Sequence, residues 1–196
     1  MEKRCEWPGN DPLMQKYHDE EWGVPLHDDR KLFEFLVLEG FQAGLSWRTI
    51  LHKREAFREV FCQFDPEKVA GFGQADVERL MQDARIIRNR LKIEACINNA
   101  RCFLHVREEY GSFDRYIWQF TNFRPLVNHF TGLEMIPAKT ELSDLISADL
   151  KKRGFKFVGS TVVYAHMQAT GMVNDHLIPC FRHHEICKMA HPEYDS

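Results

Sequence analysis

Hydrophobic residues recur at helical spacing along most of the chain. The longest such stretch follows Asn89, where apolar residues mark one helix face over roughly four turns of ~3.6 residues. They are Leu91, Ile93, Ile97, Ala100, Phe103, Leu104 and Val106. This pattern predicts the longest helix of the chain, ending near Gly111.

Shorter helices are predicted wherever a similar apolar pattern lies between a capping residue at its start and a glycine or cationic turn at its end. They run from Asp28 toward Gly44, from Asp65 to Gly71, from Asp76 to Met81, from Phe113 to Phe120, from Leu142 to Gly154 and from Thr161 to Gly171. No long stretch alternates between apolar and polar residues, so the predicted fold is all-α. Phe155–Val158 is a possible strand, too short to build a sheet alone.

The composition indicates a folded protein whose net charge produces no strong overall electrostatic field. Of the 196 residues, 44% are hydrophobic and 12% aromatic, which excludes a disordered chain. The formal net charge of -3 means that any site for a polyanion must be local. No apolar run approaches the ~20 residues of a membrane span, and the N-terminus lacks a signal peptide. We therefore expect a soluble, cytoplasmic protein with no membrane partner.

The cysteines and histidines suggest a metal site more than a disulfide framework, because disulfides are rare in a reducing cytosol. Cys5 and His18 form one dyad, and His176 and Cys180 form another at i, i+4 spacing. Together they are the ligand set of a closed tetrahedral zinc site. Unrelated core or surface residues are the more common explanation of such spacing, and four further candidates could compete as ligands: His183, His184, Cys187 and His191.

Aromatic residues gather near an acidic residue in the first quarter of the chain. Trp7, Tyr17, Trp22 and Trp47 lie around Glu39 in the sequence. A carboxylate beside aromatic rings can hold a flat cationic or amino-bearing ring by stacking on its faces and bonding its edge. The alternative is ordinary core packing with a solvent-facing carboxylate.

Two basic segments are candidate phosphate sites. Residues 78–92 predict two helices joined by a short turn, with Arg88, Arg90 and Lys92 near the helix ends. A second cluster, at residues 151–156, precedes Ser160 and Thr161 at the start of a helix. Charge runs are more often a solvated helix face. The chain contains no Gly-rich nucleotide-binding loop, no G-x-S-x-G nucleophile elbow and no H-E-x-x-H pair, which excludes the common kinase, hydrolase and metalloprotease functions. A function in nucleic-acid chemistry therefore remains the leading prediction.

Several long motifs resemble those of the DNA-3-methyladenine glycosylase I family. They are Arg4–Trp7, Tyr17–Pro25, Leu38–Trp47, Ile86–Arg90, Gly154–Gly159 and Met172–His176, in the order of the family. The resemblance extends from Arg4 to about Cys180. It implies a helix-hairpin-helix DNA glycosylase fold with two helical lobes around a base pocket. One domain at residues 1–187, with a tail at residues 188–196, is expected.

The resemblance also implies an activity and its cofactor. The enzyme would flip 3-methyladenine out of alkylated duplex DNA and hydrolyse its N-glycosidic bond as a monomer, leaving an abasic site. One structural Zn²⁺ per chain would be held by Cys5, His18, His176 and Cys180. Such a site has no open position for water, so the zinc would not take part in the reaction.

The resemblance also implies a role for individual residues of the site. Glu39 would bond the edge of the base and stabilise the developing sugar cation, Tyr17 and Trp47 would stack on the base, and Trp7 and Trp22 would complete the pocket. Gly44 and Leu45 match the wedge that fills the duplex. The hairpin that binds the phosphate backbone of DNA in this family corresponds to Ile86, Ile87, Arg88 and Arg90. Arg85 replaces a family glycine, and a left-handed backbone there would be strained.

Two other classes of function compete with the enzyme. A non-catalytic, zinc-stapled helix-hairpin-helix module would bind damaged or bent DNA without cleaving it. A zinc-stapled protein-interaction domain would show no salt-dependent DNA binding. The presence of Glu39, Tyr17 and Trp47 favours the enzyme. No aspartate matches the one that other glycosylases of this fold use to assist water, which favours easily released alkylated bases.

Overall fold

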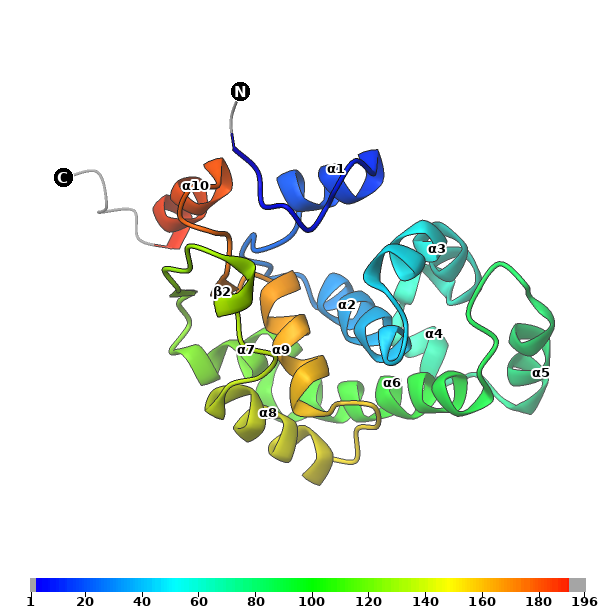
Figure 1. Ribbon diagram of the computed structural model, residues 1–196. Helices are drawn as coiled ribbons and strands as arrows, with labels where there is room; N and C mark the ends of the chain where they lie inside the picture. Colours follow the sequence, from blue (N-terminus) through cyan, green and yellow to red (C-terminus); the bar gives the residue numbers. More distant parts are fainter. Residues whose placement is uncertain (1–2, 191–196) are drawn as a thin grey trace.

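The computed structural model describes residues 3–190, and most of them are helical (Figure 1). The α-helices are α1 (Pro12–Glu20), α2 (Asp29–Gln42), α3 (Trp47–Val60), α4 (Pro66–Ala70), α5 (Gln74–Gln82), α6 (Arg90–Tyr110), α7 (Phe113–Trp118), α8 (Glu141–Lys152), α9 (Ser160–Ala169) and α10 (Phe181–Ala190). Short 3-10 turns lie at η1 (Cys62–Phe64), η2 (Gln119–Thr121) and η3 (Leu133–Met135). No helix among these residues is both long and apolar enough to cross a membrane.

The predicted helix boundaries are confirmed where capping residues set them. The Asp28 side chain accepts a hydrogen bond from the Lys31 amide at the start of α2. The Asn89 side chain accepts one from the Lys92 amide at the start of α6. Asp65 and Pro66 open α4 as expected. Gly111 ends α6 with a φ of 86°, a conformation that glycine adopts without strain.

The all-α prediction is wrong in one detail, because two very short strands are present. β1 (Leu126–Val127) pairs in parallel with β2 (Val173–Asn174), and Leu126 lies opposite Val173. Two residues per strand are too few to produce a recognisable alternation in sequence. The candidate strand Phe155–Val158 instead forms the connection between α8 and α9.

The helices lie in two groups on either side of α2 (Figure 1). α3, α4 and α5 lie on one side and α7, α8, α9 and α10 on the other, while α6 runs past α2 and contacts α4, α5 and α7. One large core of leucine, isoleucine and phenylalanine side chains lies between these elements. The N-terminal segment lies beside α10, where the Phe181 amide donates to the Lys3 carbonyl at 2.9 Å. The N-terminal segment and the start of α10 therefore lie side by side, although they are far apart in the sequence.

The last described residues of the chain continue the helical fold. Residues 188–190, the first of the segment expected to form a tail, belong to α10. The rest of that segment, residues 191–196, lies outside the described residues.

Lys92 has a structural position rather than the phosphate-binding one expected from its place near the hairpin. Its Nζ donates to the carbonyls of Phe41 at 2.8 Å and Ala43 at 2.6 Å, at the C-terminal end of α2. The residue is only 8% exposed, and burial lowers the pKa of its ammonium group. Lys92 thus satisfies carbonyls that a helix end leaves without partners and joins α6 to α2.

The end of α9 packs closely against the segment that follows α1. Gly171 has a φ of 70°, and a Cβ at this position would lie 2.4 Å from the Pro25 nitrogen. The Leu26 amide donates to the Thr170 carbonyl, and the Gly23 amide donates to the Gln168 carbonyl, each at 3.0 Å. Only glycine permits this approach, which fixes the two segments relative to each other.

We expect Lys92→Met to lower the free energy of unfolding by about 2 kcal/mol, because hydrogen bonds from a charged donor contribute about 1.5–3 kcal/mol. Urea unfolding followed by circular dichroism measures the change. Lys68→Met is the control, since the Lys68 side chain is 67% exposed. Equal midpoints for the two variants would show that Lys92 does not stabilise the end of α2.

Candidate functional site

A pocket of about 340 Å³ lies where the N-terminal segment, α1, α2, α3 and α9 meet. Its lining residues come from distant parts of the chain: Trp7, Tyr17, Trp22, Glu39, Gln42, Trp47, Leu133, Ile136, Ala165 and Gln168. All five residues predicted to form the base pocket and its catalytic group are therefore brought together. Sequence reasoning missed the other five: Gln42 lies within the Leu38–Trp47 motif without a role assigned to it, and Leu133, Ile136, Ala165 and Gln168 lie outside the quoted motifs.

Aromatic rings form the walls of the pocket. Tyr17 on α1 lies 5.3 Å from Trp47 and 6.2 Å from Trp7 between ring centroids. Trp22, just after α1, meets Trp7 edge-on at 5.1 Å. The tyrosine itself is only 2% exposed, so its ring is held firmly by its neighbours. Such walls suit a flat, unsaturated ring that stacks on their faces.

Glu39 on α2 brings an unpaired carboxyl group into the pocket. The residue is 4% exposed, and its Oε2 atom has no hydrogen-bond partner among the described residues. Burial raises the pKa of this carboxyl from 4.5 to about 8. The indole nitrogens of Trp7 and Trp47 are also buried without partners. Buried polar groups are normally satisfied, so these atoms indicate a place for a polar ligand.

Gln168 is a pocket residue with a fixed amide orientation. Its Nε2 donates to Asp175 Oδ2 at 2.8 Å. Asp175 is 1% exposed and also accepts from the Tyr164 hydroxyl at 2.6 Å and from Asn128 Nδ2 at 2.7 Å. Within the described part of the chain, Gln168 Oε1 has no hydrogen bond and is not fully enclosed, which leaves it as an acceptor at the pocket.

The four predicted metal ligands converge beside the pocket. Cys5, His18, His176 and Cys180 are all buried, and their ligand atoms lie within 4.8 Å of one another. His18 Nε2 is 3.2 Å from His176 Nδ1 and 3.5 Å from Cys180 Sγ. Cys5 Sγ is 3.9 Å from His176 Nδ1. This cluster has the donor types and the spacing to hold a metal ion.

The other ring nitrogen of each histidine has its own partner. His18 Nδ1 donates to Asp19 Oδ1 at 2.7 Å, and His176 Nε2 donates to the Trp22 carbonyl at 2.8 Å. Arg4 in turn holds the Asp19 carboxylate with two bonds of 2.7 and 2.6 Å. These bonds fix the ring orientations and point the remaining nitrogens toward the cysteines, as is usual for histidines that bind metals.

The competing ligand candidates lie outside this cluster. His183 Nε2 donates to the Asn128 carbonyl at 2.9 Å, and its Nδ1 lies 3.7 Å from Cys187 Sγ. His184 is exposed, and His191 falls outside the described residues. Across residues 3–190, the group of Cys5, His18, His176 and Cys180 is the one that could hold a metal ion.

The predicted wedge lies exposed between α2 and α3. Gly44 has a φ of 80°, which turns the chain sharply after Gln42. Leu45 is 41% exposed, a high value for a leucine. The exposed position of these residues is compatible with the predicted wedge.

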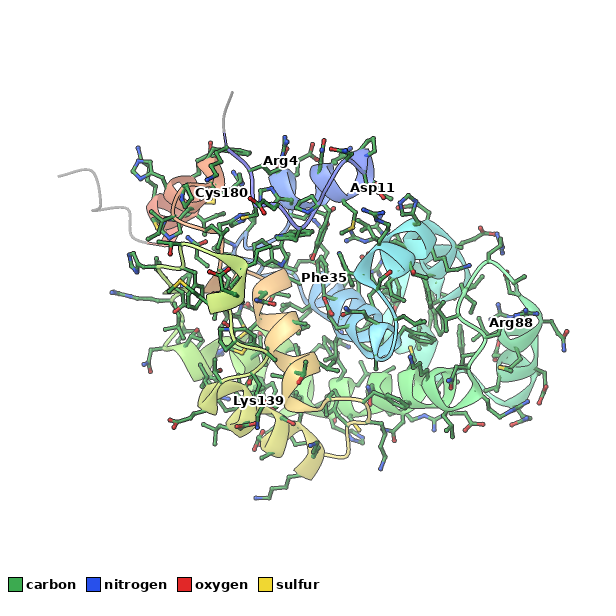
Figure 2. All side chains as sticks on the ribbon, in the orientation of Figure 1. Arg4, Asp11, Phe35, Arg88, Lys139 and Cys180 are labelled. Carbon is green, nitrogen blue, oxygen red and sulfur yellow. The ribbon has the colours of Figure 1, made fainter. Side chains whose placement is uncertain are left out.

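The predicted hairpin joins α5 to α6 through residues 83–89. Arg88 projects into solvent at the edge of the molecule (Figure 2), and among the described residues its side chain has no partner. Arg90 instead pairs with Glu78 at 2.9 Å. The Ile86 side chain is buried, while the amides of Ile87 and Arg88 donate no hydrogen bond in the described structure. The available anion-binding groups are therefore these two amides and the Arg88 guanidinium.

The expected strain at Arg85 is absent, because this residue is not among those with a positive φ. Its amide donates to Asp83 Oδ1 at 2.9 Å, and its guanidinium pairs with Asp83 and Glu59. Local hydrogen bonds thus let an arginine replace the family's glycine without a left-handed backbone. The ion pairs also remove Arg85 from the cations available for a phosphate.

The second predicted phosphate site is only partly available. Ser160 Oγ bonds Ser143 Oγ at 2.7 Å, whereas Thr161 is exposed. Gly159 precedes α9 and supplies no side-chain cap to its first amides. The backbone at the start of α9 therefore remains open to a ligand, while the Ser160 hydroxyl is already bonded.

Comparison with known proteins agrees with this geometry. A family model described as methyladenine glycosylase matches residues 7–183. The chain belongs to the methyladenine glycosylase family. It is 54% identical over 178 residues to DNA-3-methyladenine glycosylase 1 of Escherichia coli, with 91% of this chain and 95% of that protein covered.

Two further relatives agree. DNA-3-methyladenine glycosylase of Haemophilus influenzae is 48% identical over 180 residues, covering 92% of this chain and 97% of the relative. A structure of 3-methyladenine DNA glycosylase I from Staphylococcus aureus, which concerns the recognition of 3-methyladenine, is 38% identical with a TM-score of 0.89 and covers 92% and 96% of the two chains.

We predict that the free energy of unfolding depends on pH through Glu39. Its folded pKa of about 8 exceeds the ordinary value of 4.5, so its stabilising contribution is complete below about pH 4.5 and falls as pH rises to about 8. Glu39→Gln stays neutral throughout. The stability of this variant relative to the wild type should therefore rise by about 1.4 kcal/mol per pH unit across that range, in urea unfolding curves. A constant difference would contradict the raised pKa.

Proposed function

We propose that this protein is a DNA repair glycosylase that hydrolyses the N-glycosidic bond of 3-methyladenine and leaves an abasic site. The observation that carries this conclusion is the unpaired Glu39 carboxyl inside an aromatic pocket. Family membership and the names of the relatives point to the same reaction.

The pocket matches the base in shape and in hydrogen-bonding groups. The rings of Tyr17 and Trp47, whose centroids lie 5.3 Å apart, would together form an aromatic wall against the flipped base. Glu39 would bond its edge, and Gln168 Oε1 would accept from the exocyclic amino group of adenine. Because Asp175 holds the other end of the Gln168 amide, the acceptor cannot simply turn into a donor. A base with a carbonyl at that position would leave two acceptors facing each other.

The chemistry needs little acid catalysis, because N3-methylated adenine is cationic and departs as a neutral base. In the empty pocket burial keeps the pKa of Glu39 at about 8, so the carboxyl is largely protonated at neutral pH. Entry of a positively charged base favours the carboxylate and lowers this pKa. The carboxylate then stabilises the cationic sugar that develops as the bond breaks, and water attacks that sugar.

Duplex DNA would approach the face that carries Leu45 and the α5–α6 connection. We propose that Leu45 fills the gap left by the flipped nucleotide and that α5, residues 83–89 and α6 act as a helix-hairpin-helix motif. The Arg88 guanidinium and the free amides beside it would bind a backbone phosphate. We propose that the protein acts on DNA as a monomer.

We propose that zinc occupies the cluster of Cys5, His18, His176 and Cys180. Zinc–nitrogen bonds of ~2.0–2.1 Å and zinc–sulfur bonds of ~2.3 Å in a tetrahedron separate the ligand atoms by about 3.3–3.8 Å. The separations of 3.2, 3.5 and 3.7 Å among His18, His176 and Cys180 fit that geometry, whereas Cys5 Sγ, 3.9 Å from His176 Nδ1, would move slightly inward to bind the ion. With four protein ligands the ion would supply a structural link and no reactive water. The six unpaired cysteines also fit a reducing, cytoplasmic location.

We expect Glu39→Gln to slow the release of 3-methyladenine by about ten- to hundredfold, because the amide cannot stabilise the sugar cation. Purified protein is incubated with methylated duplex DNA and the released bases are separated by chromatography. The wild type should leave 7-methylguanine in the duplex. Glu141→Gln, at an exposed position on α8, is the control. A folded wild-type protein that binds this DNA but releases no base would instead support a non-catalytic module.

The protein should contain one zinc ion per chain, measured by elemental analysis after gel filtration. Cys180→Ser should lose the ion and lower the unfolding temperature by about 10 °C or more, since binding of a structural metal contributes directly to folding. Cys187→Ser is matched to it as a buried cysteine outside the cluster and should keep the ion. Equal zinc contents in the two variants would rule out the proposed ligand set.

A further inference from the structure

Phe157 has an unusual conformation for an aromatic residue. It lies in the connection between α8 and α9 with a φ of 54°, in the left-handed region that bulky residues rarely adopt. Its side chain is nevertheless 39% exposed, so burial of the ring does not account for the strain. Strained residues of this kind destabilise the fold and cluster at ligand-binding sites.

Helix α6 holds the strained segment in place. Asn99 is 5% exposed, and its side chain bonds the Lys156 backbone twice, accepting from the amide and donating to the carbonyl at 2.8 Å each. Asn98 Nδ2 donates to the Gly154 carbonyl at 2.8 Å. Two adjacent asparagines therefore fix the backbone on the N-terminal side of Phe157 and keep its ring at the surface.

The ring lies between the two segments that we propose to contact DNA. On one side, Phe157 Cβ packs against α2 and would lie 3.7 Å from a Cβ at Gly40, one helical turn before Gly44 and Leu45. On the other side, Phe157 lines an apolar recess of about 360 Å³ with Leu91, which directly follows Arg90 and is 69% exposed. Figure 1 shows the α8–α9 connection in this region, near α6 and the end of α2.

The charge at this position favours a polyanion over another protein. Lys156 lines the same recess, is exposed, and has no ion pair within residues 3–190. Glu94 also lines it, 3.8 Å from Arg90, with which it pairs. An exposed aromatic ring beside a free lysine suits a nucleic acid, whose bases stack on the ring while a phosphate meets the cation.

We propose that Phe157 is a second apolar contact to duplex DNA, next to the gap that Leu45 fills, with Lys156 on a neighbouring phosphate. The inference rests on the DNA-binding face proposed above. Phe157 would pack against a base or sugar beside the flipped nucleotide and help to keep the duplex bent.

The test uses substitutions that relieve the strain. Phe157→Gly removes the ring and suits a positive φ, and Phe157→Asn tolerates the same backbone if the glycine variant folds poorly. Phe123→Gly is the matched control, because Phe123 has a φ of 60° and is 58% exposed, in the turn after η2. Binding is measured with a duplex that contains an abasic-site analogue, at one fixed salt concentration.

We expect Phe157→Gly and Phe157→Asn to bind this duplex about tenfold more weakly than the wild type. Their affinity for free 3-methyladenine should stay unchanged, and Phe123→Gly should bind the duplex normally. Unchanged duplex affinity in the Phe157 variants, while Leu45→Ala and Arg88→Ala bind weakly, would overturn this inference and leave the DNA face intact. A parallel loss of free-base binding would also overturn it. Normal binding by all these variants would refute the DNA face itself.

Discussion

The pocket depends on a buried junction between the two ends of the chain. Cys5 and His18 come from the first twenty residues, and His176 and Cys180 from the C-terminal region, yet their ligand atoms lie within 4.8 Å. Pocket residues are attached directly to this junction. Tyr17 precedes His18, the Trp22 carbonyl accepts from His176, and the Trp7 ring lies 5.4 Å from that of His18. Loss of the junction would therefore release several walls of the pocket at once.

Another side of the pocket is formed by α2, most of whose side chains are buried. Among the described residues no cation lines the pocket around Glu39, so desolvation dominates its titration and raises its pKa to about 8. The same environment makes a cationic base a strong partner for the carboxylate. Lys92 holds the carbonyls that follow Glu39, so the end of α2 keeps its position up to the exposed Leu45. The proposed contact of Glu39 with the base and the proposed wedge at Leu45 would therefore both depend on the position of α2.

The sequence predicts those features that a few neighbouring residues determine. Capping side chains such as Asp28 and Asn89 mark the helix starts, and the aromatic and acidic motifs identify five pocket residues. The sequence does not predict features that depend on contacts between residues far apart along the chain. Gln168 faces the pocket only because α9 packs beside α2, and Asp175 then fixes its amide. Lys92 looks like a surface cation in sequence, but two carbonyls of α2 bury it.

Binding of free 3-methyladenine before and after treatment with a chelator that would remove the proposed zinc ion tests most directly whether the junction holds the pocket together. Trp7, Trp22 and Trp47 line the pocket, so quenching of tryptophan fluorescence reports the occupancy. The account predicts that chelation weakens base binding at least about tenfold while circular dichroism still shows a largely helical protein. An unchanged affinity in metal-free protein would contradict it, because the pocket would then form without the junction.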